Sequence, residues 1–109
     1  MKVFFPEINR EDVIREVGRC AKKLQEELGL EGAILFGSYA KGNYTVASDI
    51  DILIVFDDKK SREEEVYRRL MREIKLPRVE LHIISKKDLK VHEWTRWIEV
   101  IENEGVRIL

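Results

Sequence analysis

Two aspartates separated by one residue are the side chains whose type and spacing point most directly to chemistry. Asp49 and Asp51 lie at the start of a segment, Ile50 to Phe56, that is rich in β-branched residues and therefore predicts a strand. Alternate residues of a strand share a face, so both carboxylates should leave the same side, with Cα atoms about 6.5–7 Å apart. Like charges at this distance repel unless a cation neutralises them, and oxygen ligands suit Mg²⁺ or Mn²⁺. We therefore predict a divalent metal site at this acid pair.

A glycine–serine turn precedes the acid pair along the chain. A short apolar run ends at Phe36, and Gly37 and Ser38 follow it directly. Gly37 permits a tight turn and lets a phosphate approach without interference from a Cβ atom. The next residues are suited to open a short helix, whose free N–H groups attract an anion, and the Ser38 hydroxyl adds a hydrogen-bond donor. We predict a phosphate-binding turn, in which Lys41 is either a further phosphate contact or an ordinary exposed lysine.

Other interpretations of these residues are weaker. Gly42 is followed by Asn43 and Tyr44 rather than by lysine and a hydroxyl residue, which excludes a P-loop, and the spacing of Gly37 and Gly42 does not fit a dinucleotide fingerprint. The alternative interpretation of Asp49 and Asp51 is a turn aspartate that caps the strand and an ordinary surface acid. However, Asp51 is embedded among apolar residues, where a charge without a partner is expensive to bury, so the metal interpretation is favoured.

Alternating helical and strand periodicity supplies the elements that must position these residues. Asn9 and Asp12 form a capping-box pattern ahead of a helix over about 9–28, and Gly29 follows it. A second capping box, Ser61 to Glu64, predicts a helix closed by Pro77. Ser85 to Asp88 predict the cap of one last helix, whose apolar face carries Val91, Trp94, Trp97, Ile98 and Ile101. Strands are expected at 33–36, 50–56, 79–84 and 106–109.

This order of elements predicts an α/β (α+β) fold, a small sheet with helices packed on it, in one domain over residues 1–109. The net charge of −1 argues against a bulk electrostatic grip on nucleic acid. Cys20 is the only cysteine, which excludes an internal disulfide and a cysteine-based metal site. We find neither a signal peptide nor an apolar stretch long enough for a membrane span, so a cytoplasmic protein without membrane partners is expected.

The order of the two motifs resembles a known signature. Gly37-Ser38, then ten residues, then Asp49-Ile50-Asp51 in an apolar strand is similar to the pattern of the polymerase-β-like nucleotidyltransferase superfamily. The fuller string GSYAKGNYTVASDIDILIVF resembles its smallest members, the minimal nucleotidyltransferases found beside helical HEPN proteins in prokaryotic toxin–antitoxin pairs. The resemblance covers about residues 30–109, the catalytic core. It implies the mixed-sheet fold of that superfamily, a nucleoside triphosphate such as ATP held by the turn, and Mg²⁺ or Mn²⁺ held by the aspartates.

The family pattern also contains a third acid on a later strand between apolar residues. Val79-Glu80-Leu81 fits it, so the resemblance implies that Glu80 shares the metal and helps to remove a proton from the acceptor. Many relatives have aspartate at this place, and the longer glutamate shifts the carboxylate by about one C–C bond. The alternative is a half-exposed strand that shows Glu80 and His82 to water, and for His82 a solvated or hydrogen-bonded ring is the expectation.

By resemblance, the chain transfers a nucleoside monophosphate, AMP from ATP, to a hydroxyl of a HEPN-type toxin and acts as its antitoxin. Because nearly all residues are needed for the fold, the acceptor surface should come from another protein or a second subunit, which implies a homo- or hetero-oligomer. The competing hypothesis is a non-catalytic nucleotide-binding antitoxin that masks its partner by stoichiometric binding. Trp94 and Trp97 are assigned to the core, and they would mark a partner surface only if their face were exposed. Tyr39 and Tyr44 either pack or flank the nucleotide.

Overall fold

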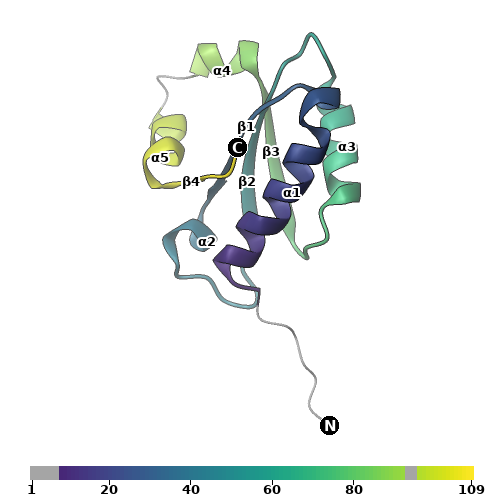
Figure 1. Cartoon of the computed structure of the whole chain (residues 1–109). Coiled ribbons are helices and arrows are strands. Elements are labelled where there is room, and N and C mark those ends of the chain that lie inside the picture. Colours follow the sequence, from purple (N-terminus) through teal and green to yellow (C-terminus); the bar gives the residue numbers. More distant parts are fainter. Residues whose placement is uncertain (1–7, 93–95) are drawn as a thin grey trace.

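A mixed sheet of four strands is the framework of the structure (Figure 1). The computed structural model describes residues 8–92 and 96–109. Within them the strands are β1 (Leu30–Phe36), β2 (Ile50–Phe56), β3 (Val79–Ser85) and β4 (Val106–Arg107), in the spatial order β3-β2-β1-β4. β1 runs antiparallel to both β2 and β4, whereas β2 and β3 are parallel. The predicted fold class is therefore confirmed.

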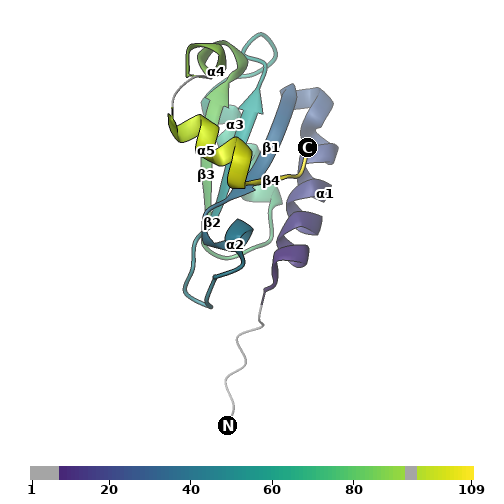
Figure 2. The same cartoon turned by 90° about the vertical axis from the view of Figure 1, so that its left-hand side faces the viewer.

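Helices cover both faces of this sheet (Figures 1 and 2). α1 (Arg10–Leu28) and α3 (Glu63–Glu73) lie on one face, and α5 (Arg96–Glu104) lies on the other. α4 (Lys86–His92) follows β3 at one end of the sheet, and α2 (Ser38–Lys41) follows β1 at the opposite end. None of the described helices has both the length and the apolar character that crossing a membrane requires.

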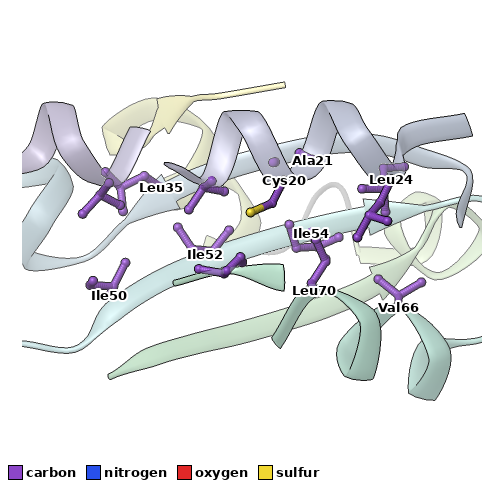
Figure 3. Close-up of a cluster of buried hydrophobic side chains, with 14 of the residues drawn as sticks. Cys20, Ala21, Leu24, Leu35, Ile50, Ile52, Ile54, Val66 and Leu70 are labelled. Carbon is purple, nitrogen blue, oxygen red and sulfur yellow. The ribbon is translucent and has the colours of Figure 1, made fainter. Parts of the chain in front are cut away.

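The alternation of side chains along the strands divides the interior into two cores. On the face of α1 and α3, the even-numbered residues of β2 pack into a large buried cluster (Figure 3). On the other face, a smaller cluster forms around Leu53, Ile98 and Ile101. Burial also raises the pKa of Cys20, which lies in the large core, to about 11, so its thiol stays protonated. The labelled residues of the large core in Figure 3 are Cys20, Ala21, Leu24, Leu35, Ile50, Ile52, Ile54, Val66 and Leu70.

The ends of α1 follow the local rules of the sequence. The Asn9 side chain accepts a hydrogen bond from the Asp12 backbone N–H at 2.8 Å, and the Asn9 backbone N–H donates to the Asp12 carboxylate at 3.3 Å. This reciprocal pair satisfies amide groups that have no partner inside the helix. Gly29 ends the helix in the left-handed conformation, with a φ of 69°. The predicted helix over 9–28 is confirmed at both ends.

The predicted capping box at Ser61 is wrong. Ser61 is buried, and its hydroxyl donates to the backbone carbonyl of Leu28 at 2.5 Å. α3 begins at Glu63, and Arg62 occupies the N-cap position without a side-chain hydrogen bond to the helix. The physical reason is that the last carbonyls of α1 lack partners inside their own helix, and an unpaired buried acceptor costs more than an uncapped exposed helix end.

The predicted last helix corresponds to α4 and α5 in the described residues. Val91 on α4 is 58% exposed, contrary to its predicted place on the apolar face, and Trp94 lies outside the described residues. The Ser85 hydroxyl accepts from the Asp88 N–H at 3.0 Å, as the predicted cap requires. Ile98 and Ile101 fill the core, whereas Trp97 is 50% exposed, so its assignment to the core is wrong. Adjacent helix positions differ by about 100°, which places Trp97 at the rim of the buried face.

Glu16 links α1 to the segment that follows α3. Its carboxylate accepts hydrogen bonds from the Arg19 guanidinium at 2.9 and 3.0 Å and from the Lys75 backbone N–H at 2.8 Å. The hydrogen bonds from Arg19, followed by the one from Lys75, lower the pKa of Glu16 from 4.5 to about 2. The charged form of the Glu16 carboxyl group therefore stabilises the folded protein more than the neutral form does.

We predict that Glu16→Gln lowers the free energy of unfolding at pH 7 by about 1 kcal/mol, because the neutral amide accepts weaker hydrogen bonds. A lowered folded-state pKa contributes stability that is present above the unfolded value of 4.5 and is lost as the pH falls toward about 2. The difference between the two proteins in urea unfolding should therefore shrink between pH 5 and pH 2. Glu26→Gln, at an exposed position of the same helix, is the control. An equal difference at pH 7 and pH 2 would contradict this assignment.

Candidate metal and nucleotide site

Three titratable side chains converge on the α5 face of the sheet, near the end where β1 meets α2. Asp51 on β2 is in register with Glu80 on β3, and His82 lies two residues further along β3. One ligand atom from each residue lies within 4.8 Å of those from the other two. Residues in register on neighbouring strands place their side chains on the same face. The structure thus brings Asp51 and Glu80 together, as the sequence predicts, and adds His82.

The position of Asp51 follows from the large core. Its neighbours Ile50 and Ile52 are buried under α1, so strand alternation turns the Asp51 carboxylate to the opposite face, where its side chain is 23% exposed. Across β1 it is paired in register with Phe36. A carboxylate held in a strand between apolar residues needs a partner for its charge.

The absence of a side chain at Gly37 leaves space for the Asp51 carboxylate. The φ of Gly37 is 75°, a region that L side chains rarely adopt, and a Cβ atom at this position would lie 2.5 Å from the Asp51 carboxylate oxygen Oδ2. Glycine is thus required twice, for the backbone conformation and for the close approach. The turn predicted from the glycine–serine pair therefore lies directly against the predicted metal-binding aspartate.

His82 has a buried nitrogen without a hydrogen-bond partner. Its Nε2 atom lies 3.5 Å from Asp51 Oδ1 and makes no hydrogen bond to any described group, although the side chain as a whole is 33% exposed. The ring packs against Phe36, with centroids 5.1 Å apart, and against Trp97 at 6.2 Å. His82 is therefore neither solvated nor hydrogen-bonded at this nitrogen, contrary to expectation. The sequence signal that could have placed it at the site is its position two residues after Glu80, on the same face of β3.

Asp49 is exposed and lies one residue before β2, so it is outside the strand whose alternation predicted its direction. In the loop that carries it, the Thr45 N–H donates to the Ser48 hydroxyl at 2.8 Å, and the Arg78 guanidinium donates to the backbone carbonyl of Val46. Among the described residues, the group that can share a cation comprises Asp51, Glu80 and His82, and the role of Asp49 stays a prediction.

The turn after β1 is anchored to α1. Gly37 is the N-cap residue of α2, and Ser38 is half-buried at its first position. The rings of Tyr39 and Tyr44 are stacked, with centroids 4.2 Å apart and planes within 5°, and Tyr39 is buried. Tyr39 and Tyr44 thus pack against each other. The Arg10 guanidinium donates to the Ala40 carbonyl at 3.0 Å, which ties the turn to the N-terminal end of α1.

Lys41 points to α5 in this structure. Its ammonium group lies 3.5 Å from the Glu104 carboxylate, and both side chains are exposed. An exposed ion pair of this kind contributes little to stability and is easily exchanged for another anion. A contact between Lys41 and a nucleotide phosphate therefore stays a prediction.

The three clustered residues fit a divalent cation. Carboxylates and a neutral imidazole are common ligands of such ions, and one of the donors here is a buried nitrogen that the described protein leaves unpaired. A bound cation would relieve both the repulsion between the two acids and the missing partner of His82.

Comparison with known proteins places the chain in a family. Residues 17–107 match the family described as the nucleotidyltransferase domain. Two proteins of Methanocaldococcus jannaschii, each named "putative protein adenylyltransferase", are 35% identical over 78 residues and 34% identical over 82 residues. These alignments cover 70% and 72% of this chain and 78% and 79% of the relatives.

The fold has a counterpart among solved structures. The crystal structure of a "putative nucleotidyltransferase" from Sulfolobus solfataricus matches 96% of this chain and 90% of its own, with a TM-score of 0.50 and 22% identity. The glycine turn and the acid cluster both lie within the residues that match the family model. The chain therefore belongs to the nucleotidyltransferase domain family, and it is a nucleotidyltransferase.

Proposed function

We propose that this protein is a protein adenylyltransferase, which transfers AMP from ATP to a hydroxyl group of a partner protein with the aid of Mg²⁺ or Mn²⁺. The observation that carries the proposal is the contact of the Gly37 turn with the Asp51 carboxylate, which is itself clustered with Glu80 and His82. The names of the two archaeal relatives support adenylyl transfer to protein. We place the reaction in the cytoplasm, where ATP is available.

Each residue has a role in this proposal. The backbone after Gly37 and the Ser38 hydroxyl bind the β- and γ-phosphates, to which Lys41 adds charge. Asp49, Asp51 and Glu80 hold the divalent cation, which when bound neutralises phosphate charge and stabilises the departing pyrophosphate.

The reaction itself is an in-line displacement at phosphorus. The acceptor oxygen attacks the α-phosphorus of ATP, an O–P bond forms, and the bond to the oxygen that bridges the α- and β-phosphates breaks, releasing pyrophosphate. Glu80 is exposed and so is open to an incoming acceptor. Its carboxylate receives the proton of the acceptor hydroxyl.

An exposed apolar patch on α5 provides the surface for the acceptor. Trp97 and Val100 are 50% and 43% exposed, and residues three apart share a helix face. Trp97 also packs edge-on against Phe36, so the patch begins at the site itself. Exposed tryptophans are frequent anchors of protein interfaces. We propose that this patch binds a helical HEPN-type toxin and that the chain is its antitoxin.

The same patch is the observation that favours a second candidate function. A surface that binds a partner tightly enough neutralises it by masking alone, and the nucleotide site is then dispensable for the antitoxin effect. The two candidates differ in whether the acid cluster is needed once the partner is bound.

For the catalytic proposal, Asp51→Asn should lower transfer of labelled AMP to the partner by about 100-fold or more, because the cation loses a charged ligand. Partner binding, measured by calorimetry, should be unchanged. Asp58→Asn, in the turn after β2 at the other end of the sheet, is the matched control. If the Asp51→Asn protein still neutralises the partner fully, masking is the function.

Gly37→Ala should weaken binding of ATP with Mg²⁺ or Mn²⁺ by about 10-fold or more, because its Cβ displaces the Asp51 carboxylate. Gly42→Ala is a matched control: Gly42 also has a positive φ, of 82°, but a Cβ there has no neighbour within 4 Å. Both variants carry backbone strain, so equal losses of ATP affinity in calorimetry would attribute the effect to strain and not to the carboxylate.

Trp97→Ala should raise the KM for the protein acceptor by about 10-fold, the consequence of losing a single interface anchor. The affinity for ATP should change much less, because Phe36 still packs against the His82 ring. Tyr67→Ala removes a comparably exposed aromatic, at 48%, from α3 on the opposite face and should leave this KM unaltered. Equal KM values for the Trp97 variant and the unmodified protein would place the acceptor elsewhere.

A further inference from the structure

We infer that His82 is a metal ligand, so that the site contains an ion position with one nitrogen and two carboxylate donors that selects Mn²⁺ over Mg²⁺. This inference rests on the proposed function, because the ion is the one that the proposed reaction uses. It adds a ligand and a metal preference that the acidic residues alone do not imply.

The first support is the environment of the His82 nitrogen. Nε2 is buried and unpaired among the described groups, and it faces the Asp51 carboxylate. Buried polar atoms without a partner are rare, because losing their contact with water is costly. A cation between these residues gives this nitrogen the partner that the protein does not.

A direct ion pair between His82 and Asp51 explains the geometry less well. Charged N–H···O hydrogen bonds are about 2.7–2.9 Å long, whereas these two atoms are 3.5 Å apart. Donors that share one cation at about 2.1 Å lie no more than about 4.2 Å from each other. The donors of Asp51, Glu80 and His82 already lie within 4.8 Å of one another. A small closure of side chains therefore suffices for them to share an ion.

The second support is the packing that orients the imidazole. The ring is tilted at 59° to both Phe36 and Trp97, which contact it from β1 and from α5. A ligand held in one orientation by its surroundings loses less freedom when it binds an ion. These aromatic contacts thus prepare the ring to bind a metal.

The chemistry of the donors determines the preference. Mg²⁺ favours oxygen ligands, whereas imidazole nitrogen favours the first-row transition ions. The acid pair predicted from the sequence, Asp49 and Asp51, would be an all-oxygen set of the kind that suits Mg²⁺. Asp51, Glu80 and His82 form a mixed set, and Asp51 belongs to both. His82 therefore shifts the selectivity of the site toward Mn²⁺.

Calorimetric titration of the full chain with Mn²⁺ alone and with Mg²⁺ alone tests the inference. The unmodified protein should bind Mn²⁺ at least about 10-fold more tightly than Mg²⁺. His82→Asn replaces the nitrogen donor by an oxygen, and it should reduce Mn²⁺ affinity by about 10-fold or more while changing Mg²⁺ affinity much less. His92→Asn, at the other histidine of the chain, should keep the original ratio.

Pulsed electron paramagnetic resonance of bound Mn²⁺ detects the ligand directly. Modulation from a coupled nitrogen should appear in the unmodified and His92→Asn proteins and vanish in His82→Asn. Thermal unfolding verifies that each variant is folded, and His82→Gln repeats the test if His82→Asn is not. An unchanged ratio of Mn²⁺ to Mg²⁺ affinity in the folded variant, or the absence of nitrogen coupling, overturns the inference.

Asp51→Asn separates this inference from the proposed function. If Asp51→Asn abolishes Mn²⁺ binding and His82→Asn leaves it intact, the site binds metal without His82. The inference about His82 is then wrong, and the proposed function is unaffected. If neither substitution changes binding of either metal, the cluster is not a metal site, and the proposed function fails as well.

Discussion

The placement of the Asp51 carboxylate is the constraint on which the site depends. Its neighbours Ile50 and Ile52 belong to the large core, so the alternation of β2 forces the charge onto the other face. Shifting the register of β2 by one residue would bury a carboxylate under α1 and expose the isoleucines. Hydrophobic burial thereby fixes where the negative charge lies. Pairing with β1 brings Gly37 against it, and pairing with β3 brings Glu80 and His82.

One face of the sheet carries the large core, and the other face carries the candidate site. α1 and α3 cover one face with the large core, and contacts such as that of Glu16 with Lys75 tie these helices to the chain around them. The other face has a smaller core around Leu53 and a groove of about 530 Å³ beneath α4 and α5. On this face Glu80 and Trp97 are exposed, whereas Asp51 and His82 are partly exposed. The large core thus holds α1 and α3 to the sheet, while the second face is covered only in part.

The sequence predicts features that depend on near neighbours and misses those that depend on distant ones. The cap of α1 at Asn9 and the bounds of β2 follow from residues within four positions, and both are confirmed. Ser61 has a local capping pattern, yet its hydroxyl donates a hydrogen bond to a backbone carbonyl 33 residues earlier in the chain. Trp97 fits the apolar helix pattern, but the narrow contact of α5 with the sheet buries only Ile98 and Ile101. The orphaned nitrogen of His82 depends on β1, β2 and α5 together, and no local pattern contains it.

The contribution of β3 to the site differs from the pattern that the resemblance implies, in which this strand supplies one short acid. Here β3 presents two donors to Asp51, a glutamate in register with it and a histidine two residues further on. A rise of about 3.3 Å per residue separates the Cα atoms of these donors by about 6.6 Å. Their donor atoms nevertheless lie within 4.8 Å of each other, so the two side chains must lean toward a common point. The extra methylene of Glu80, compared with aspartate, supplies reach for such convergence. The longer acid and the histidine are therefore best understood as one arrangement around a single centre.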